Sequence, residues 1–502
     1  MKRAAYVLAA FWVVLTAADA ANYYVNDTNS AGDVYCSALG NDSNSGLSNS
    51  APKATIQRIV DLYDLGGGDT IYVDTGIYYP TNVGKESPGV DLQAWDGGSV
   101  GSYMTIQGST NEAAGGSLFI RGSSVYPAFH SWSSGWIALK NLRITDGQFG
   151  FNARMVSNLV FENCFIYNNY GDGALIRECG DVFFRRCRLY HNSGSGLTLW
   201  GGVTRIFMDQ CTVWSNHYDD SGGPLAEIYY DDGADLLSLS NTIILARGTG
   251  HVCMHMDWTS FLPYTADYNN LCAIENAYVG GYGISGAFQT LASWQAASGQ
   301  DSNSIGGYPE LTYDGHLKSR AGTWSNGTWV VYATNSPCID RGNPAAAYSN
   351  EPAPNGGRLN IGAFGNTGQA SKTADYDGDG LSDNSECYDY GTNPNLADTD
   401  GDQYNDFAEL IAGTGPTDGT NFFEVADAPQ TNKSRFTMRW YGVSGRTYQP
   451  QWRTNLVNGT SWTNCTGLIG SSGTLNTNLI GSNTWITAVD TNANGKTFRY
   501  YR

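Results

Sequence analysis

Two segments in the last third of the chain place oxygen-bearing groups at a repeated spacing. In the first segment they fall at loop positions 1, 3, 5, 7, 9 and 12, position 7 through its carbonyl oxygen: Asp375, Asp377, Asp379, Leu381, Asp383 and Glu386. The second segment begins 23 residues later and has carboxylates at five of these positions: Asp398, Asp400, Asp402, Asp406 and Glu409. Such closely spaced carboxylates repel one another unless a hard cation, which takes about six to eight oxygen ligands, lies between them. The spacing therefore predicts two calcium sites.

The two loops differ at position 6, where the chain must turn sharply. Gly380 stands there in the first loop and adopts the required conformation without strain, whereas the second loop has Gln403. We therefore expect a less favourable turn in the second loop. The alternative for both segments is a solvated acidic linker that binds no metal.

A second group of candidate residues comes from strand-like segments between residues 151 and 257. Successive side chains of a strand point to opposite faces, so Phe151 and Ala153, or Leu197 and Leu199, would point inward. The outward positions then form one face: Arg154, Arg177, Trp200, Tyr229, Asp231, His255 and Asp257, with Glu227 as an alternative to Tyr229. This face combines arginines, aromatic rings and carboxylates, and it is the predicted active surface.

One reaction that fits this face is β-elimination from a uronic acid. Arg154 or Arg177, or a bound calcium ion, would neutralise the sugar carboxylate and so acidify the neighbouring ring proton. Tyr229 or His255 would then remove that proton as the general base. This reaction would make the protein a lyase that cleaves an acidic polysaccharide.

A second reaction that fits is hydrolysis of a glycosidic bond. Asp231 and Asp257 on neighbouring turns of the chain would act as acid and nucleophile, because their mutual repulsion separates their pKa values. Trp200 would hold a sugar ring in either reaction. The third possibility is a purely structural outer face, and among the two reactions the sequence favours elimination.

The segments that must hold these side chains repeat along the chain. Similar stretches begin at residues 141, 163, 186 and 210, so that successive copies lie 22, 23 and 24 residues apart. A period in this range is typical of a solenoid. The copies are rich in Ile, Val, Phe and Tyr and alternate with polar residues, which indicates strands. They predict an all-β fold in which each copy is one coil of a right-handed parallel β-helix.

Cysteines occupy one inward position of successive coils, at Cys164, Cys187 and Cys211. A disulfide between neighbouring coils is sterically conceivable, since strands lie about 4.8 Å apart. A stack of small buried side chains is the favoured interpretation.

Two further columns of equivalent positions indicate how the coils are held in register. A corner column that predicts a ladder of amide hydrogen bonds consists of Asn169, Asn192 and Asn216. An outward column that alternates in charge, and to which we assign no chemistry, consists of Lys140, Glu162, Arg185 and Asp209.

Residues 1–20 have the features of a secretory signal. A basic pair at Lys2-Arg3 precedes an apolar run, and small residues end the segment at Ala18-Asp19-Ala20. The apolar run is shorter than the roughly 18 residues that a membrane helix needs. We therefore expect the mature chain to be secreted, or held at the surface of a bacterial cell.

The rest of the chain divides into three regions. Residues 21–372 hold the β-helix with a helical cap near its start, residues 373–419 hold the calcium-binding repeats, and residues 420–502 form a C-terminal module. Short strand-like runs in this module predict a small β-sandwich. Trp440 and Trp452 are expected in its core, and the module is a candidate for attachment to a cell surface or a protein partner.

Composition excludes one class of partner. The net charge is −19, and only 15% of the residues are charged. No stretch resembles the basic stripe that binds a phosphate backbone. We therefore expect no nucleic-acid partner.

The opening and closing segments of the first region are similar to those of a known superfamily. Residues 23–25 and 68–73 at the start, with 336–342 and 360–365 at the end, resemble the pectate-lyase-like right-handed β-helix superfamily. This resemblance covers roughly residues 21–370 and implies the fold; the superfamily includes lyases, glycosidases, epimerases and adhesins. The acidic loops are similar to thrombospondin type 3 and dockerin-like calcium repeats, which implies a stiff spacer or, less readily, pairing with another protein.

Together these features favour a secreted enzyme that cleaves a uronate-containing polysaccharide by β-elimination. The main alternative is a non-catalytic extracellular protein that binds glycans, adheres or builds a surface. A glycoside hydrolase that uses the paired aspartates is the further alternative.

Overall fold

The computed structural model describes residues 20–80, 89–217, 225–230, 236–256, 264–282 and 286–421, and short strands between 425 and 501. The expected signal segment therefore lies outside the described residues, apart from Ala20. The chain forms two compact units, Met1–Lys372 and Thr373–Arg502. None of the described helices is long and apolar enough to cross a membrane.

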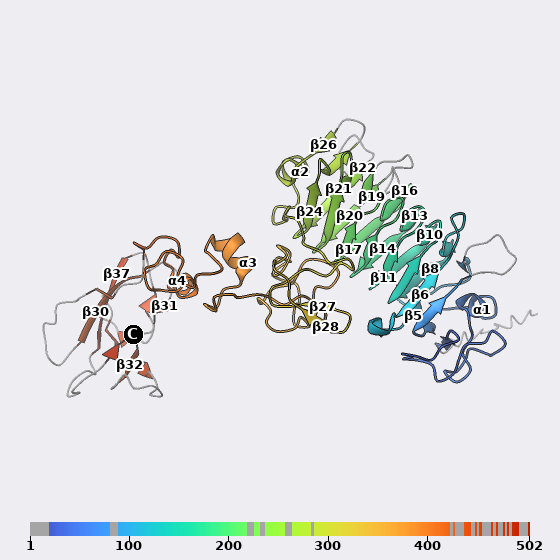
Figure 1. Cartoon of the computed structure of the whole chain (residues 1–502), viewed down its shortest axis with the longest axis horizontal. Helices are drawn as coiled ribbons and strands as arrows, with labels where there is room; N and C mark the ends of the chain where they lie inside the picture. Colours follow the sequence, from blue (N-terminus) through green and yellow to red (C-terminus); the bar gives the residue numbers. More distant parts are fainter. Residues whose placement is uncertain are drawn as a thin grey trace, which may run out of the picture. The chain divides into compact units, whose positions relative to one another are not determined.

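The first unit winds through three sheets in turn, which confirms the predicted parallel β-helix (Figure 1). Sheet A contains β1 (Asn22–Val25), β2 (Thr70–Val73), β5 (Met104–Gly108), β8 (Gly135–Lys140), β11 (Ser157–Glu162), β14 (Asp181–Arg185), β17 (Arg205–Asp209), β20 (Leu236–Ser240) and β23 (Tyr264–Asp267). Sheet B contains β3 (Gly76–Tyr78), β6 (Ser117–Ile120), β9 (Leu142–Thr145), β12 (Phe165–Tyr167), β15 (Arg188–Tyr190), β18 (Thr212–Trp214), β21 (Ile243–Arg247) and β24 (Asn270–Ile274). Sheet C contains β4 (Val90–Leu92), β7 (Phe129–Trp132), β10 (Phe151–Arg154), β13 (Ala174–Arg177), β16 (Leu197–Trp200), β19 (Ala226–Tyr230), β22 (Val252–Met256), β25 (Tyr278–Tyr282) and the antiparallel β26 (Gly286–Phe288).

Each coil turns from sheet A to sheet B at one residue in the left-handed conformation. Asn141, Asn163 and Arg186 hold this position in successive coils, with φ of 55°, 51° and 51°. Asparagine tolerates the conformation well because its short polar side chain can bond locally. The repeated stretches recognised in the sequence therefore begin at the corner of each coil.

The core consists of the inward side chains of all three sheets. Phe161 and Phe184 occupy equivalent positions of neighbouring coils and stack with ring centroids 4.6 Å apart. Cys164, Cys187 and Cys211 are reduced and fully buried, so the buried stack, not a disulfide, is confirmed.

The asparagine ladder also forms as predicted. Asn169 Nδ2 donates to Asn192 Oδ1 at 2.8 Å, and Asn192 Nδ2 donates to Asn216 Oδ1 at 2.8 Å. The charged column differs in one partner. Glu162 pairs with Lys140 at 3.2 Å and with the corner residue Arg186, not with Arg185.

Helices cover the two ends of the coil stack (Figure 1). At the start, α1 (Ile56–Val60) buries three apolar side chains, which fulfils the expected cap. At the far end, α2 (Leu291–Ser298) buries Trp294 completely, and the indole Nε1 donates to Asp301 at 3.1 Å. The caps keep water from the terminal coils.

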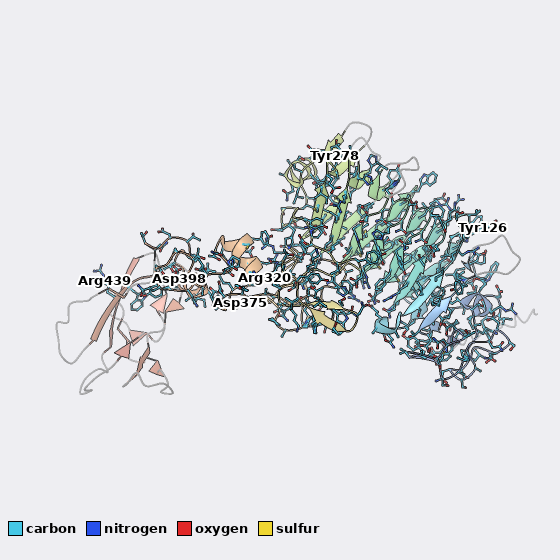
Figure 2. The ribbon with its side chains drawn as sticks, viewed as in Figure 1. Tyr126, Tyr278, Arg320, Asp375, Asp398 and Arg439 are labelled. Atoms are coloured by element: carbon cyan, nitrogen blue, oxygen red, sulfur yellow. The ribbon has the colours of Figure 1, made fainter. Side chains whose placement is uncertain are left out.

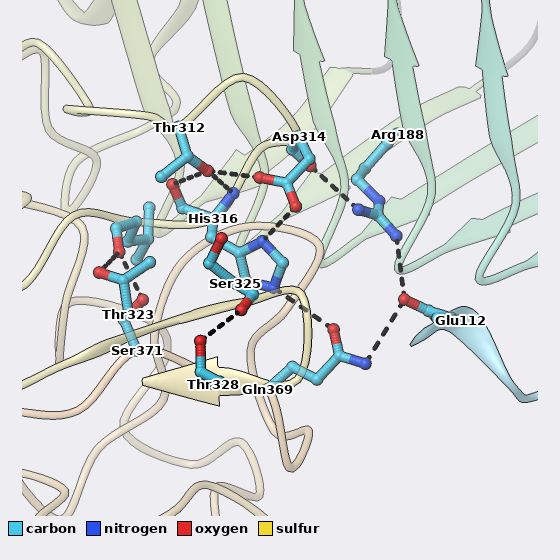
Figure 3. Close-up of polar contacts among 11 residues, drawn as sticks. Glu112, Arg188, Thr312, Asp314, His316, Thr323, Ser325, Thr328, Gln369 and Ser371 are labelled. Carbon is cyan, nitrogen blue, oxygen red and sulfur yellow. Dashed lines mark hydrogen bonds and ion pairs between the residues drawn. The ribbon is translucent and has the colours of Figure 1, made fainter. Parts of the chain in front are cut away.

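The segment after α2 packs against sheet B and includes the hairpin of β27 (Thr323–Ser325) and β28 (Thr328–Val330). A ring of hydrogen bonds and ion pairs holds this segment next to η1 (Glu112–Ala114), as Figure 3 shows. The residues that form the ring are Glu112, Arg188, Asp314, His316 and Gln369. The Arg188 guanidinium lies between the rings of Phe165 and Phe364, 3.0 and 4.3 Å from their centroids. Burial lowers the pKa of Arg188 to about 10.

The second unit begins with α3 (Asp383–Ser385), the π-helical η2 (Glu386–Tyr390) and α4 (Asp406–Ala412). Short strands with antiparallel pairing follow: β29 (Val425–Ala426), β30 (Phe436–Gly442), β31 (Thr447–Tyr448), β32 (Gln451–Arg453), β33 (Thr463–Asn464), β34 (Leu468–Ile469), β35 (Leu475–Asn476), β36 (Leu479–Ile480), β37 (Thr484–Asp490) and β38 (Tyr500–Tyr501). Trp440 is buried, as expected for a core residue, whereas the side chain of Trp452 lies outside the described residues.

Candidate functional site

The outward face of sheet C carries two parallel columns of side chains. The terminal column, at the carboxyl ends of the strands, consists of Trp132, Arg154, Arg177 and Trp200. The central column, two residues earlier in each strand, consists of Asp91, His130, Asn152, Leu175, Thr198, Tyr229 and His255. Within each column, successive residues are Cα partners on neighbouring strands.

The terminal column brings together three residues that the sequence placed on one face. Arg154 and Arg177 are direct neighbours, and Trp200 is the next partner after Arg177. Trp132 completes the column on the other side, a position that the sequence analysis missed although it follows from the same alternation one coil earlier. Trp132 and Trp200 are 49% and 52% exposed, so two open aromatic rings flank the two arginines.

The two arginines are held in different ways. Arg154 Nη2 pairs with Glu178 Oε1 at 3.0 Å, and its guanidinium lies 6.0 Å from the Trp132 ring centroid. Arg177 Nη2 donates to Asn152 Oδ1 at 3.1 Å, and Arg177 contacts no carboxylate among the described residues. A guanidinium has five N–H donors, so Arg177 keeps donors for an anionic ligand while one fixed amide sets its orientation.

Tyr229 and His255 do not lie in the column of the arginines, which corrects the predicted arrangement. Tyr230 is buried opposite Leu199, and this pairing places Tyr229 opposite Thr198 in the central column. The rings of Tyr229 and His255 stack with centroids 5.6 Å apart. Two strand intervals separate Tyr229 from Arg177, about 10 Å along the sheet.

Glu227, the alternative outward residue, points into the protein. It is 3% exposed, and its Oε2 accepts a hydrogen bond from Asn216 Nδ2 at 2.6 Å. Burial raises the pKa of Glu227 to about 8. The side chain takes the next place in the asparagine ladder, which removes it from the face. Asp231 and Asp257 lie outside the described residues, so the paired-aspartate hypothesis stays a prediction.

The central column also holds a histidine–aspartate pair that the repeat pattern of the sequence did not reveal. His130 Nδ1 lies 2.7 Å from Asp91 Oδ1, and the two residues are Cα partners on β7 and β4. Both are partly buried, with side chains 17% and 27% exposed. The His130 and Trp132 rings meet edge to face at 6.5 Å. The pair therefore borders the terminal column.

A cleft of about 710 Å³ follows the corner between sheets A and B, away from sheet C. Tyr35, Tyr72, Lys140, Glu162 and Arg186 are among its lining residues. Lys140 and Arg186 in this cleft both pair with Glu162. An anionic ligand would therefore have to compete with Glu162 for them, whereas Arg177 has no such competitor among the described residues. We therefore assign the candidate site to sheet C and not to this cleft.

The acidic loops of the second unit bring their first three carboxylates together. One ligand atom from each of Asp375, Asp377 and Asp379 lies within 4.8 Å of the others, and the same holds for Asp398, Asp400 and Asp402. Figure 2 labels Asp375 and Asp398, the first residue of each loop. Glu386 and Glu409 at position 12 are buried, and each has an Oε2 without a hydrogen-bond partner. Orphaned buried carboxylate oxygens and an all-oxygen donor set fit a hard cation such as calcium.

The remaining loop positions brace the turn. Asp383 and Asp406 accept the backbone N–H groups of Tyr376 and Thr399 at 2.8 and 2.9 Å, and neither is one of the clustered carboxylates. The Leu381 N–H donates to Asp379 Oδ1 at 2.7 Å. These bonds hold each loop in the curved form that a cation needs.

Position 6 turns in both loops, with φ of +107° at Gly380 and +81° at Gln403. The second loop therefore forms the turn in spite of its side chain. After each loop a threonine hydroxyl donates to the position-12 carboxylate, from Thr392 to Glu386 at 3.3 Å and from Thr414 to Glu409 at 3.1 Å. The Gly-Thr pair that follows each loop in the sequence is thus part of the same arrangement.

Comparison with known proteins agrees with the fold. The family described as "Right handed beta helix region" matches residues 102–284. No curated protein matches the chain. Among solved structures the chain is similar to pectate lyase Pel9A, with 13% identity over 69% of this chain and 97% of that chain and a TM-score of 0.38. It is also similar to a rhamnogalacturonan lyase (14% identity, 51% and 75% covered, TM-score 0.33) and to the A-module of the Azotobacter vinelandii mannuronan C-5 epimerase AlgE6 (10%, 49% and 75%, 0.25).

Proposed function

We propose that the protein binds a uronate-containing polysaccharide along the outward face of sheet C and cleaves it by β-elimination. The observation that carries this proposal is the terminal column, in which two adjacent arginines lie between two exposed tryptophans. Its four positions span three strand intervals, about 14 Å. An extended glycan that runs parallel to the coil axis can contact all four side chains at once.

The side chains suit an acidic sugar for physical reasons. A guanidinium binds a carboxylate through two parallel hydrogen bonds, which fixes both its position and its orientation. The indole faces of Trp132 and Trp200 offer apolar, half-exposed surfaces on which sugar rings can pack. Arg177, which the Asn152 amide holds in place, is assigned to the carboxylate of the sugar that reacts.

Elimination follows from this assignment. The proton on the carbon next to a uronate carboxylate becomes acidic only when the charge that develops on the carboxylate is stabilised, and a fixed cation does this. Binding without catalysis remains the second candidate, because Glu178 already neutralises Arg154. The two candidates differ in whether unsaturated sugar ends form.

We further propose where the protein acts and what its second unit does. We place the protein outside the cell, after removal of the signal at residues 1–20. Calcium in the acidic loops would stiffen the spacer between the β-helix and the C-terminal module, which would attach the enzyme to a surface or a partner. The buried carboxylate oxygens that lack a hydrogen-bond partner in both loops, Oε2 of Glu386 and Oε2 of Glu409 among them, support this role.

The test is incubation of the purified protein with polygalacturonate, alginate and rhamnogalacturonan, with unsaturated ends followed by ultraviolet absorbance. We expect at least one polymer to be cleaved, and we expect Arg177→Ala to abolish cleavage. Arg247→Ala is the matched control, since Arg247 is exposed on sheet B and pairs with Glu275. Binding without unsaturated ends or new reducing ends would favour the non-catalytic candidate, and new reducing ends alone would favour hydrolysis.

A further inference from the structure

The His130–Asp91 pair has the arrangement of an oriented proton acceptor. An ionised carboxylate can only accept hydrogen bonds, so the 2.7 Å contact with Asp91 places the proton on His130 Nδ1. In the neutral imidazole the other ring nitrogen, Nε2, carries the lone pair. Within the described part of the chain, Nε2 makes no hydrogen bond. A histidine held in this tautomer can remove a proton from a ligand on the same face.

The aspartate is itself held on two sides. Gln93 Nε2 donates to Asp91 Oδ2 at 2.6 Å, and the Asp91 N–H donates to Gln57 Oε1 at 2.8 Å. The carboxylate therefore keeps one oxygen for His130 and one for Gln93. A simple surface pair needs no such support, because exposed ion pairs contribute little to stability.

The pair lies on the side of the face toward which the Arg177 side chain leans. His130 is the Cα partner of Asn152, and Asn152 Oδ1 accepts a hydrogen bond from Arg177 Nη2 at 3.1 Å. The Arg177 side chain thus reaches back by one strand toward His130. Arg154 lies on the strand next to that of His130, two residues closer to the carboxyl end of the sheet. A carboxylate bound by Arg177 would lie above the strand next to His130.

The alternative bases lie on the other side. Tyr229 is two strands beyond Arg177 and His255 is three strands beyond it. Their rings stack on each other with centroids 5.6 Å apart. Because Arg177 leans away from them, they are farther from the sugar carboxylate than His130 is.

We propose that His130, oriented by Asp91, is the general base of the elimination. This inference rests on the proposed function and adds the group that the reaction requires. Nε2 takes the proton from the carbon that bears the uronate carboxylate. The electron pair of that C–H bond forms a double bond to the adjacent carbon, and the bond from that carbon to the glycosidic oxygen breaks. The oxygen leaves with its electron pair and takes the proton back from the imidazolium, so no further reactant is needed.

The test compares His130→Gln, His130→Ala and Asp91→Asn with wild type on the polymer that wild type cleaves. For His130→Gln we expect kcat to fall by about 10²- to 10⁴-fold, the usual contribution of a general base, while KM stays near its wild-type value. For Asp91→Asn we expect kcat to fall at least about tenfold, since an amide can donate to Nδ1 and invert the tautomer. Added imidazole should restore part of the activity of His130→Ala, which a merely structural histidine would not allow. His191→Gln is the matched control, since His191 directly follows β15 at the corner between sheets B and C and belongs to neither column of the ligand face.

The outcomes separate the two proposals. If wild type forms no unsaturated ends on any polymer, the proposed reaction is wrong, and the base assignment is wrong with it. If wild type is active and His130→Gln keeps its kcat, or if Tyr229→Phe or His255→Gln abolishes kcat instead, the assignment to His130 is refuted while the elimination stands. Thermal unfolding of each variant shows whether it folds; should His130→Gln not fold, imidazole rescue and Asp91→Asn decide.

Discussion

Replacement of Glu227 by glutamine tests the register of the coils that carry the site. Glu227 continues the ladder of Asn169, Asn192 and Asn216, and it is buried at the start of β19. Burial raises its pKa from the ordinary value of 4.5 to about 8. Glutamine keeps an oxygen that can accept the Asn216 amide but cannot ionise.

The sign and size of the effect follow from proton linkage. Between pH 4.5 and about 8 the folded protein keeps a proton on Glu227 that the unfolded chain has lost. The contribution of this group to stability is therefore greatest below the lower value, falls as pH rises through the window, and is constant above it. At about 1.4 kcal/mol for each pKa unit, the whole window amounts to about 5 kcal/mol, of which about 4 kcal/mol falls between pH 5 and pH 8.5.

The assay is urea unfolding of wild type and Glu227→Gln at pH 5 and pH 8.5, followed by circular dichroism of the strands. We expect the difference in unfolding free energy to shift toward the variant by about 4 kcal/mol between the two pH values. Any pH-independent cost of the extra amide protons cancels in this comparison. Glu351→Gln is the matched control: burial raises the pKa of Glu351 to about 7, so its effect should have the same sign and be complete at lower pH. A difference that does not change with pH would show that Glu227 is solvated and that the register at β19 is wrong.

Three further predictions concern the ligand face and the acidic loops. Trp132→Ala and Trp200→Ala should each weaken binding of an oligouronate by about 1–2 kcal/mol in calorimetry, as an aromatic anchor does, with little change in thermal stability because both side chains are half exposed. Gln403→Gly should stabilise the calcium-bound second unit by about 1 kcal/mol in thermal unfolding, because a non-glycine residue is strained at φ +81°. A chelator should destabilise that unit by about 2.7 kcal/mol when calcium had been present at a hundred times its Kd.

Each of these has its own contrary result. If a variant with both Trp132→Ala and Trp200→Ala bound the oligouronate as tightly as wild type, the two rings would not stack on the sugar. Gly380→Gln should destabilise the calcium-bound second unit, opposite to Gln403→Gly. If both substitutions changed its thermal stability equally, the residue at position 6 would not determine the stability of either loop. Unfolding of residues 373–419 that is unaffected by the chelator would leave the acidic loops as a solvated linker.

The fold was predictable because the β-helix uses the same inward positions once per coil. The 22–24-residue period carries Cys164, Cys187 and Cys211 to one column, and the corner asparagines to another. Each coil buries its side chains on its neighbours, so periodicity and packing give the same register. Arg154 and Arg177 followed directly, since both lie inside this regular stretch.

The remaining residues of the ligand face were harder to predict from the sequence, because they lie where the spacing between coils departs from 22–24 residues. The coil that leads from β16 to β19 is longer than the others: the Cα partners Leu197 and Ile228 are 31 residues apart, and only the burial of Tyr230 against Leu199 shows that Tyr229 belongs to the central column. His130 and Asp91 are 39 residues apart, well beyond one period. Alternation within a strand also gave Glu227 the wrong direction, because its side chain bonds the asparagine ladder at a corner.

A crystal structure of the His130→Gln variant with a uronate oligosaccharide from the cleaved polymer would show directly whether the outward face of sheet C binds the substrate. We expect a sugar ring against Trp132 or Trp200, and a carboxylate within about 2.9 Å of the Arg177 guanidinium. An oligosaccharide bound in the cleft between sheets A and B, or on sheet C without contact to Arg177, would contradict the account.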